Sequence, residues 1–311
     1  MTNAPNTPDA PLPPLTVAVL GPGGVGGLLA ALLSRSGHRV ICLAAEETAR
    51  TLRTDGIQVR SALFGDFTAS VEAETVLREP VDACLITVKA TALDAALTRI
   101  PPTALGDALL VPFLNGVEHP ALLRARYSPD RVAPSVIRVE STRLAPGLIE
   151  HGSPFAEIDL TGAKVPRPRL EALAEALTAA GPATRVLDDE TTALWAKMSF
   201  LAPLALLTTR YGLPLGETRI RHREELASLV AETVAVSRAC GAPADPARTL
   251  ARYDTFPPAT RSSMQRDAEA GRPLELDAIG GALLRAADRH GVPVPVTARV
   301  VRELRESAGG R

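Results

Sequence analysis

Short apolar runs alternate with amphipathic stretches through the first half of the chain. The runs are β-branched and bounded by turn residues, as buried parallel strands are, and they predict strands at Thr16–Leu20, Val40–Leu43, Gln58–Ala62, Ala83–Val88, Ala108–Leu114 and Thr184–Leu187. Apolar positions at helical spacing predict helices directly after Gly27 and at Ala92–Arg99, Pro120–Arg126 and Pro168–Ala180. Two further runs look like strands added at a sheet edge, Val132–Val139 and Leu148–His151. The alternation predicts a Rossmann-type, doubly wound parallel α/β fold.

The pattern changes after Asp188, where long helical periods replace the strand-like runs. We expect helices at Thr191–Thr209, Glu224–Cys240 and Ala278–His290, and no further strands. The predicted organisation is therefore a Rossmann-type domain over residues 15–187 and an all-α domain over residues 188–311. Residues 1–14 are rich in proline and have neither a basic start nor an apolar core, so we expect a disordered lead-in rather than a signal peptide.

Composition and charge narrow the classes of function. A formal net charge of −1 offers no basic surface for nucleic acid, and no apolar run approaches the ~20 residues of a membrane span. We therefore expect neither nucleic acid nor a membrane among the partners. The cysteines are odd in number and widely spaced, which favours reduced thiols in a cytoplasmic protein: Cys42, Cys84 and Cys240. The histidines lack metal-ligand spacing and no GxSxG segment occurs, so we expect no metal site and no serine hydrolase.

A glycine-rich segment joins the first predicted strand to the first predicted helix. Gly21, Gly23 and Gly26 satisfy G-x-G-x-x-G, and Gly24 and Val25 fill the positions between the last two. The pattern alone is weak, but in this strand–turn–helix context it is typical of a loop that binds the pyrophosphate of a dinucleotide. Glycine allows the tight turn, and the helix N-terminus offers unpaired N–H groups to the anion. We therefore predict that these five residues bind a dinucleotide.

The choice between NAD and NADP depends on the end of the second strand. An acidic residue there favours the free 2′-hydroxyl of NAD, whereas an arginine favours the 2′-phosphate of NADP. The tip reads Ala44-Ala45-Glu46-Glu47 and is followed by Arg50 and Arg53. Glu46 would repel a 2′-phosphate and Arg50 could attract one, but the same charges also fit a solvated helix face. The sequence leaves both cofactors open at this point.

Lysine is scarce in this chain. Lys89, Lys164 and Lys197 are the only lysines among 34 basic residues, so arginine is used almost wherever a positive charge is needed. An ammonium group can give up a proton, whereas a guanidinium group effectively cannot. Each lysine is therefore a candidate for proton chemistry, and the ordinary alternative for each is a surface position.

Several segments, taken in order, resemble the ketopantoate reductase (2-dehydropantoate 2-reductase) family. They are Gly21–Gly26, Thr87–Ala90, Asn115–Glu118, Leu194–Lys197, and Ser262–Asp267 followed by Glu275–Asp277. The resemblance runs from about Val17 to about Thr297. It implies a Rossmann domain followed by a helical substrate and catalytic domain, with the active site between them. It also implies reduction of a small 2-oxo acid with NADP, NAD being possible, and by default the step from ketopantoate to pantoate in pantothenate biosynthesis.

The resemblance also implies roles for individual residues. Lys197 corresponds to the catalytic lysine, and an ammonium group there can stabilise the developing oxyanion and deliver a proton. Glu275 corresponds to its acidic partner. Lys89 would reach the cofactor, and Asn115 would lie between the cofactor and the substrate. The ordinary alternatives are a lysine on an amphipathic helix, a surface glutamate, a strand-end charge and an Asn-Gly turn.

Ser263 corresponds to the serine that contacts the substrate carboxylate in this family. Its hydroxyl can donate to a carboxylate, and Asp267 would lie four residues further along the same helix face. The competing interpretation is that Ser262 or Ser263 caps the helix instead.

The match fails where the family usually places substrate-binding asparagines. Those positions here read Leu201, Ala205 and, by the same reasoning, Leu215, and the family's arginine at the end of the second strand is replaced by Ala45. Each lost hydrogen bond is worth ~0.5–1.5 kcal/mol, so a polar substrate should bind less well. The alternatives are therefore a paralogous reductase with a less polar keto substrate and possibly NAD, and a non-catalytic dinucleotide-binding regulator. A homodimer is possible through the long apolar helices.

Overall fold

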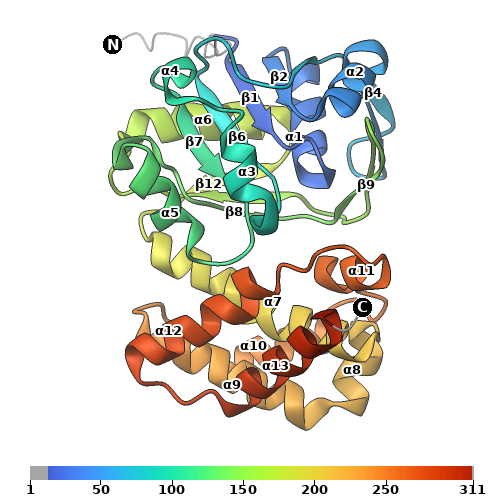
Figure 1. The fold of residues 1–311 in the computed structure, drawn as a ribbon, viewed down its shortest axis with the longest axis vertical. Coiled ribbons are helices and arrows are strands. Elements are labelled where there is room, and N and C mark those ends of the chain that lie inside the picture. Colours follow the sequence, from blue (N-terminus) through green and yellow to red (C-terminus); the bar gives the residue numbers. More distant parts are fainter. Residues whose placement is uncertain (1–12, 310–311) are drawn as a thin grey trace, which may run out of the picture.

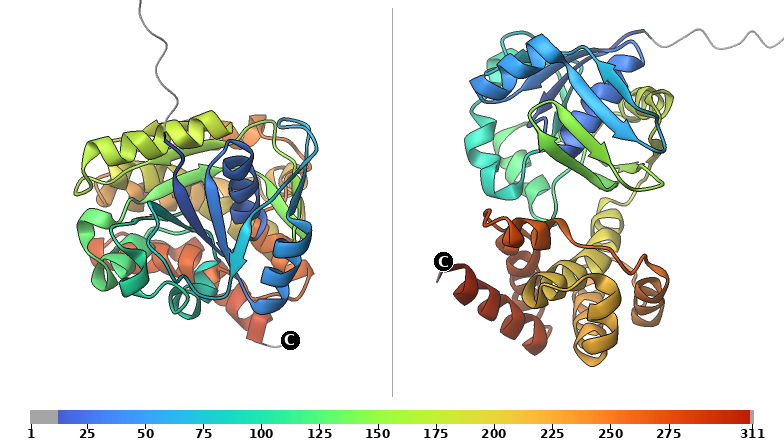
Figure 2. Two further views of the ribbon diagram at one scale, coloured as in Figure 1. Left: turned by 90° about the horizontal axis from the view of Figure 1, so that it is seen from above. Right: turned by 90° about the vertical axis from the view of Figure 1, so that its right-hand side faces the viewer.

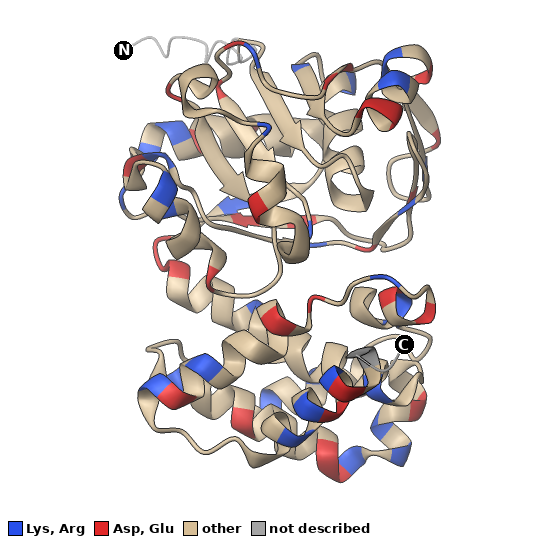
Figure 3. Ribbon diagram, viewed as in Figure 1, with Lys and Arg blue, Asp and Glu red and all other residues tan. Residues whose placement is uncertain are grey.

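The described residues of the computed structural model, 13–309, form a strand-rich N-terminal part and a helical C-terminal part (Figure 1). Figure 2 shows the two parts stacked one on the other. Charged residues of both signs are spread over both parts (Figure 3). Apart from Pro13 and Pro14, the predicted disordered lead-in over residues 1–14 lies outside the described residues.

A five-stranded parallel sheet forms the centre of the N-terminal part. Its strand order is β5-β2-β1-β6-β7, with β1 (Thr16–Leu20), β2 (Arg39–Leu43), β5 (Glu72–Glu74), β6 (Ala83–Ile86) and β7 (Leu109–Pro112). Val17 and Val19 of β1 pack on one face with helix α1 (Gly24–Arg35), while Ala18 and Leu20 pack on the other face with α3 (Leu93–Leu97). A parallel sheet covered on both faces is the predicted doubly wound arrangement, which is confirmed.

Two smaller sheets accompany the central sheet. One has the order β4-β3-β10-β9, with β3 (Ile57–Ser61), β4 (Phe67–Ala69), β9 (Ser141–Ala145) and β10 (Leu148–His151). The other has the order β12-β11-β8, with β8 (Ser135–Arg138), β11 (Glu157–Leu160) and β12 (Ala183–Val186). The remaining helical segments of this part are α2 (Glu46–Asp55), η1 (Ala90–Ala92), α4 (Pro102–Leu105), α5 (His119–Arg126), η2 (Pro129–Arg131) and α6 (Arg167–Ala180).

The strands predicted at 132–139 and 148–151 at a sheet edge exist, and neither extends the central parallel sheet: β8 forms the edge of one smaller sheet, whereas β10 lies inside the other. β8 and β10 belong to the two smaller sheets, and only a bridge between Leu110 and Val132 ties the segment before β8 to the central sheet. Pro134 follows that bridge, and a proline has no N–H with which to continue a ladder. Ser135 instead donates its hydroxyl hydrogen bond to the Pro112 carbonyl at 2.6 Å.

The C-terminal part consists of helices packed around α7. Its elements are α7 (Glu190–Tyr211), α8 (Leu215–Arg221), α9 (Arg223–Ala239), α10 (Pro246–Thr255), α11 (Ser263–Glu269), η3 (Asp277–Gly281), α12 (Ala282–His290) and α13 (Pro295–Gly309). No strand follows Val186 among the described residues, as predicted. The helix predicted at 278–290 begins as a π-helical turn, η3. By length and composition α7 alone among the described helices could cross a membrane, but most of it is buried inside the protein, as in a core helix.

The two parts have separate apolar cores. The helical core gathers around Trp195 and Met198 of α7 and excludes the residues of the sheets. β12 ends at Val186 and α7 begins at Glu190, so the domain boundary that we propose at 187/188 falls in this connection. The arrangement places the carboxyl ends of β6 and β7 against η3 and the segments that flank it, where the polar contacts between the parts are concentrated.

Candidate active site

The glycine-rich loop makes the predicted turn from β1 into α1. Gly21 has φ of +87°, and its N–H donates to the Leu43 carbonyl at the end of β2 at 3.1 Å. A Cβ on Gly26 would lie 2.2 Å from Thr87 Oγ1, so this glycine is required by the close packing of α1 against the loop after β6. The loop thus has the geometry that the sequence motif predicts.

Gly23 differs from its neighbours in what surrounds it. A Cβ there would have no heavy atom nearer than 3.9 Å, so no neighbouring side chain or backbone of this chain requires a glycine at that position. Gly23 is the N-cap of α1, so no side chain caps this helix, and the first turn has no acidic residue. An open approach to free helix N–H groups, with no competing carboxylate, fits the pyrophosphate of a dinucleotide.

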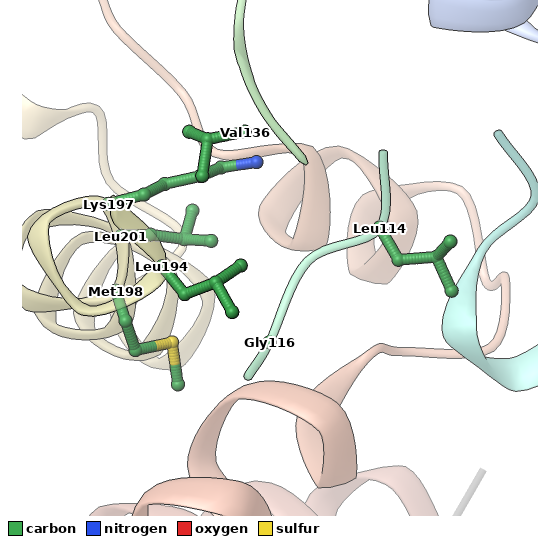
Figure 4. Close-up of a pocket in the computed structure, with 7 residues that line it drawn as sticks. All are labelled: Leu114, Gly116, Val136, Leu194, Lys197, Met198 and Leu201. Carbon is green, nitrogen blue, oxygen red and sulfur yellow. The ribbon is translucent and has the colours of Figure 1, made fainter. Parts of the chain in front are cut away.

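A narrow apolar pocket surrounds the side chain of Lys197. Figure 4 shows Lys197 extending from α7 toward Val136 of β8, while Leu194 and Leu201 project from α7 into the same space. The pocket lies between α7 and the loop after β7, and it is lined by Leu114, Gly116, Val136, Leu194, Lys197, Met198 and Leu201. Apart from Lys197, every side chain of this lining is apolar.

The ammonium group of Lys197 has an unusual environment. No hydrogen bond or ion pair joins its Nζ to any of residues 13–309, although the residue is half-buried. Burial lowers the pKa of Lys197 to about 8, the charge of Glu275 opposes this shift, and the charge of Arg138 adds to it. An unpaired amine with a pKa near neutrality can act as a proton donor.

Glu275 joins two loops of the N-terminal part to the helical part. Its side chain is 5% exposed, and its Oε1 accepts from the Ala90 N–H at 2.9 Å while Oε2 accepts from Asn115 Nδ2 at 3.0 Å. Gly116, next to Asn115, has φ of +94°, and a Cβ there would lie 2.4 Å from the Ala278 carbonyl oxygen. The carboxylate is therefore fixed at the contact between the two parts and acts electrostatically on Lys197.

Lys89 makes a second ionic contact between the parts. Its Nζ lies 2.5 Å from Oδ2 of Asp267, a side chain only 3% exposed, while Arg272 Nε donates to Oδ1 of the same carboxylate at 2.9 Å. Lys89 remains 43% exposed. It lies at the carboxyl end of β6, where a dinucleotide bound to the glycine-rich loop would pass. The structure thus places Lys89 at the contact between the two parts, held by an acid of α11.

The two serines of the late motif have different roles. Ser262 is the N-cap of α11, and its Oγ accepts from the Gln265 N–H at 3.0 Å. Ser263 is exposed, and its hydroxyl has no hydrogen-bond partner among the described residues. The capping alternative therefore applies to Ser262 and leaves the hydroxyl of Ser263 free for a ligand.

The three positions at which this chain lacks the family's asparagines lie in different surroundings. Leu201 lines the pocket, one helical turn from Lys197. Ala205 and Leu215 are buried, and both belong to the core of the helical part rather than to the pocket lining. Only the first substitution therefore changes the lining of this pocket directly.

The tip of β2 carries a cation that the sequence did not indicate. Arg99, which follows α3, donates from Nη1 to the carbonyl oxygens of Ala44 at 2.9 Å and Thr75 at 2.8 Å. Glu46, the acid that would repel a 2′-phosphate, forms an ion pair with Arg53 at 2.8 Å. The charge of Glu46 is thus partly compensated by Arg53, and the guanidinium of Arg99 reaches the end of β2 from the segment after α3.

Two charged or titratable residues that no sequence pattern indicated lie near Lys197. Arg138 of β8 and His119 at the start of α5 belong to no motif, and only their proximity in the fold identifies them. His119 is buried, and neither ring nitrogen has a hydrogen-bond partner among the described residues. Burial, with a smaller contribution from the Lys197 charge, lowers the pKa of His119 to about 3, so its ring is neutral. No group of three or more potential metal ligands occurs within residues 13–309.

Comparison with known proteins decides the family. The family model described as ketopantoate reductase PanE/ApbA matches residues 17–160, and the model of its C-terminal region matches residues 189–308. The 2-dehydropantoate 2-reductase of Mycobacterium tuberculosis is 30% identical over 310 residues, covering 94% of this chain and 98% of that protein. The chain belongs to the ketopantoate reductase family. Its members are oxidoreductases that act on CH–OH groups with a nicotinamide dinucleotide.

Solved structures agree with this membership. The ketopantoate reductase from Ralstonia eutropha superposes with a TM-score of 0.86 at 28% identity, covering 95% of this chain and 99% of that one. A D-mandelate dehydrogenase bound to NADH and anilino(oxo)acetate gives the same TM-score at 18% identity, covering 95% and 99% of the two chains. The second likeness shows a shared fold alone.

Proposed function

We propose that this chain is an NADP-dependent reductase of a 2-oxo acid, by default of ketopantoate to pantoate, with Lys197 and Glu275 as the catalytic pair. The observation that carries the proposal is the unpaired Lys197 ammonium in the pocket, near the fixed carboxylate of Glu275. Family membership supplies the reaction type. Gly21, Gly23, Gly24, Val25 and Gly26, with Lys89 and Asn115, would hold the cofactor, and Asn115 and Ser263 would contact the substrate.

The chemistry follows from what these groups can do. The nicotinamide dinucleotide, when bound in its reduced form, would supply the hydride that the carbonyl carbon accepts. Lys197 gives a proton from Nζ to the carbonyl oxygen, so that C=O becomes CH–OH, and the resulting neutral amine regains a proton from solvent. Before transfer, the ammonium stabilises negative charge on that oxygen in a pocket with little competing water. Glu275 orients Asn115 and favours the charged form of the lysine.

Two observations at β2 support NADP. Glu46 is paired with Arg53, so its charge is partly neutralised, and Arg99 places a guanidinium against the Ala44 carbonyl. We propose that Arg99 takes the place of the family's arginine, which is Ala45 here, toward the 2′-phosphate. Titration with adenosine 2′,5′-bisphosphate and with AMP tests this without catalysis. Arg99→Gln should weaken only the bisphosphate, and equal weakening of both would contradict it.

The alternative substrate is a less polar 2-oxo acid, and Leu201 in the pocket lining favours it. The experiment that separates the two is to follow the oxidation of NADPH and NADH side by side with ketopantoate and with 2-oxo acids carrying branched or aromatic side chains. Oxidation with ketopantoate alone supports the default substrate, and oxidation with the apolar acids alone supports the alternative. Cofactor binding without turnover on any acid would favour a non-catalytic regulator. A cytoplasmic location and a homodimer remain predictions.

A further inference from the structure

The three-stranded sheet presents one face to each part of the molecule. Ile137 of β8 and Ile158 of β11 pack into the core around α1 and α6. Because side chains alternate along a strand, Val136 and Arg138 lie on the opposite face. Val136 packs there against Leu194 of α7 and lines the pocket of Lys197. Arg138 is therefore on the face of the sheet that is turned toward the proposed catalytic lysine.

The chain beyond Arg138 runs along the cleft. Glu140 forms an ion pair with Arg266 of α11 at 2.7 Å, and Ser141 donates its hydroxyl hydrogen bond to the Gly24 carbonyl at 2.8 Å. Within six residues, 136–141, this segment contacts the pocket of Lys197, the helix that carries Ser263 and the first turn of the dinucleotide loop. Arg138 lies in the middle of that path, between the residue that lines the pocket of Lys197 and the residue that contacts the first turn of α1.

A buried carboxylate fixes the guanidinium of Arg138. Its Nη1 donates to Oδ2 of Asp159 at 2.7 Å, and Oδ1 of the same carboxylate accepts from Arg185 at 2.7 Å. Asp159 is 1% exposed, whereas the side chain of Arg138 keeps 25% of its surface open. Glu157 lies further from the same nitrogen, at 3.7 Å. The Nε and Nη2 donors of Arg138 have no partner within residues 13–309.

We propose that Arg138 binds the carboxylate of the 2-oxo acid substrate through its two free donors. Two parallel N–H groups match the two oxygens of a carboxylate, and Asp159 holds them in place in advance. The proposal rests on the proposed function, because it needs a 2-oxo acid as substrate. It also accounts for how a pocket that carries Leu201 can still recognise an acid: the apolar wall receives the side chain of the substrate and the arginine receives its charge.

The chain offers a matched control for this arginine. Arg185 shares the Asp159 carboxylate but is 65% exposed and lies on β12, at the opposite edge of the sheet from β8. Arg138→Gln and Arg185→Gln each remove one charge from Asp159 and leave the other, so both should fold. Arg138→Lys retains the charge and loses the fork, and Ser263→Ala removes the other proposed carboxylate contact. Thermal unfolding of all four variants shows whether they are folded.

The measurement is kcat/KM for the best 2-oxo acid found with the wild-type protein and for the methyl ester of the same acid. In Arg138→Gln we expect the value for the acid to fall about 10- to 100-fold while that for the ester changes little, with Arg138→Lys between it and the wild type. The affinities of an oxamate analogue and of its uncharged amide, measured by displacement without turnover, should change in the same way: Arg138→Gln should weaken the binding of the charged analogue and leave that of the amide unchanged. Arg185→Gln should behave as the wild type.

Equal losses for acid and ester in Arg138→Gln, or no loss for either, would overturn the proposal. The proposal would also be overturned if kcat/KM for the acid alone fell in Ser263→Ala or in Arg185→Gln but not in Arg138→Gln. These outcomes require that the wild-type protein reduce a 2-oxo acid. If it reduces none, the proposed function itself fails, and that result is distinct from a failure at Arg138.

Discussion

The proposed dinucleotide side and the proposed substrate side of the active site are built from different parts of the chain. The proposed dinucleotide side consists mainly of main chain, namely a glycine-rich turn, strand ends and a helix N-terminus, with the side chains of Lys89, Asn115 and Arg99 as additional proposed contacts. The substrate side consists of side chains on α7 and β8, and its character depends on single residues such as Leu201 and Arg138. A site made of backbone groups needs glycine at the same positions even when the rest of the sequence differs, so a short sequence motif identifies it. A site built from side chains can change its ligand through one or two substitutions without disturbing the fold.

The largest effect should come from Lys197 on the substrate side. Lys197→Ala removes the proton donor and should lower turnover about 10²- to 10⁴-fold while leaving the binding of NADPH intact. Lys197→Arg should also lose most of the activity, because a guanidinium retains charge but does not release a proton. Steady-state kinetics and NADPH fluorescence titration measure the two quantities. The exposed Lys164→Arg is the control, and near-normal turnover in Lys197→Ala would remove the lysine from the mechanism.

On the dinucleotide side, two glycines should fail in different ways. Gly26→Ala places a Cβ against Thr87 and Gly21 and should destabilise the fold by about 1–3 kcal/mol. Gly23→Ala meets open space, so the fold should remain as stable as the wild type while the affinity for NADPH falls at least about 10-fold, because the Cβ occupies the approach of the pyrophosphate. Thermal unfolding and NADPH titration separate the two. Unchanged affinity in Gly23→Ala would place the cofactor elsewhere.

The pH dependence tests the electrostatics of the substrate side alone. Because the pKa of Lys197 is lowered to about 8, the ammonium form predominates below that pH, is half populated at it, and falls about tenfold for each unit well above it. Reduction should therefore lose kcat/KM on a basic limb near pH 8, and oxidation of the hydroxy acid should show the opposite trend. NADPH binding should not follow this limb. A reduction rate that stays flat to well above pH 8 would contradict proton donation by Lys197.

The smallest effect should come from Leu201→Asn, which restores the family's residue in the pocket lining. The amide adds a hydrogen-bonding group one turn from Lys197, so the preference for ketopantoate over an apolar 2-oxo acid should rise about 3- to 10-fold. Ala205→Asn is the matched comparison, since that position lies in the helical core and should mainly cost stability. A rise in Ala205→Asn that Leu201→Asn does not show would reverse our assignment of the pocket.

Sequence predicted more of the dinucleotide side than of the substrate side. Strands β1, β2, β6 and β7 of the central sheet and the turn at Gly21 follow from local patterns. The fifth strand of that sheet, β5, and strand β4 have only three residues each, too few for a period to show. The division into three sheets depends on which strands meet, and no local pattern records that. Leu215 appeared to be a pocket position, yet the packing of α8 takes it into the core.

Arg138 and Arg99 show the same limit within the site. Each lies far along the chain from the motif beside which we propose that it acts, and in a sequence that uses arginine for nearly every positive charge nothing sets them apart. Only the pairing of β8 with β11, and the path of the chain after α3, bring them to the cleft. Side chains that complete a site from other elements are the part that sequence patterns do not predict.

The scarcity of lysine has a practical consequence for covalent chemistry. Neutral amines attack amine-reactive reagents whereas ammonium groups do not, and near pH 8 about half of the Lys197 side chains are neutral. Lys89 is held in an ion pair with Asp267, and Lys164 is the only other lysine in the sequence. Among the lysines, a mild acylating probe with an apolar body that fits beside Leu194 and Leu201 should therefore label Lys197 first. The same bond would make this amine an attachment point for a reporter group or for an irreversible inhibitor.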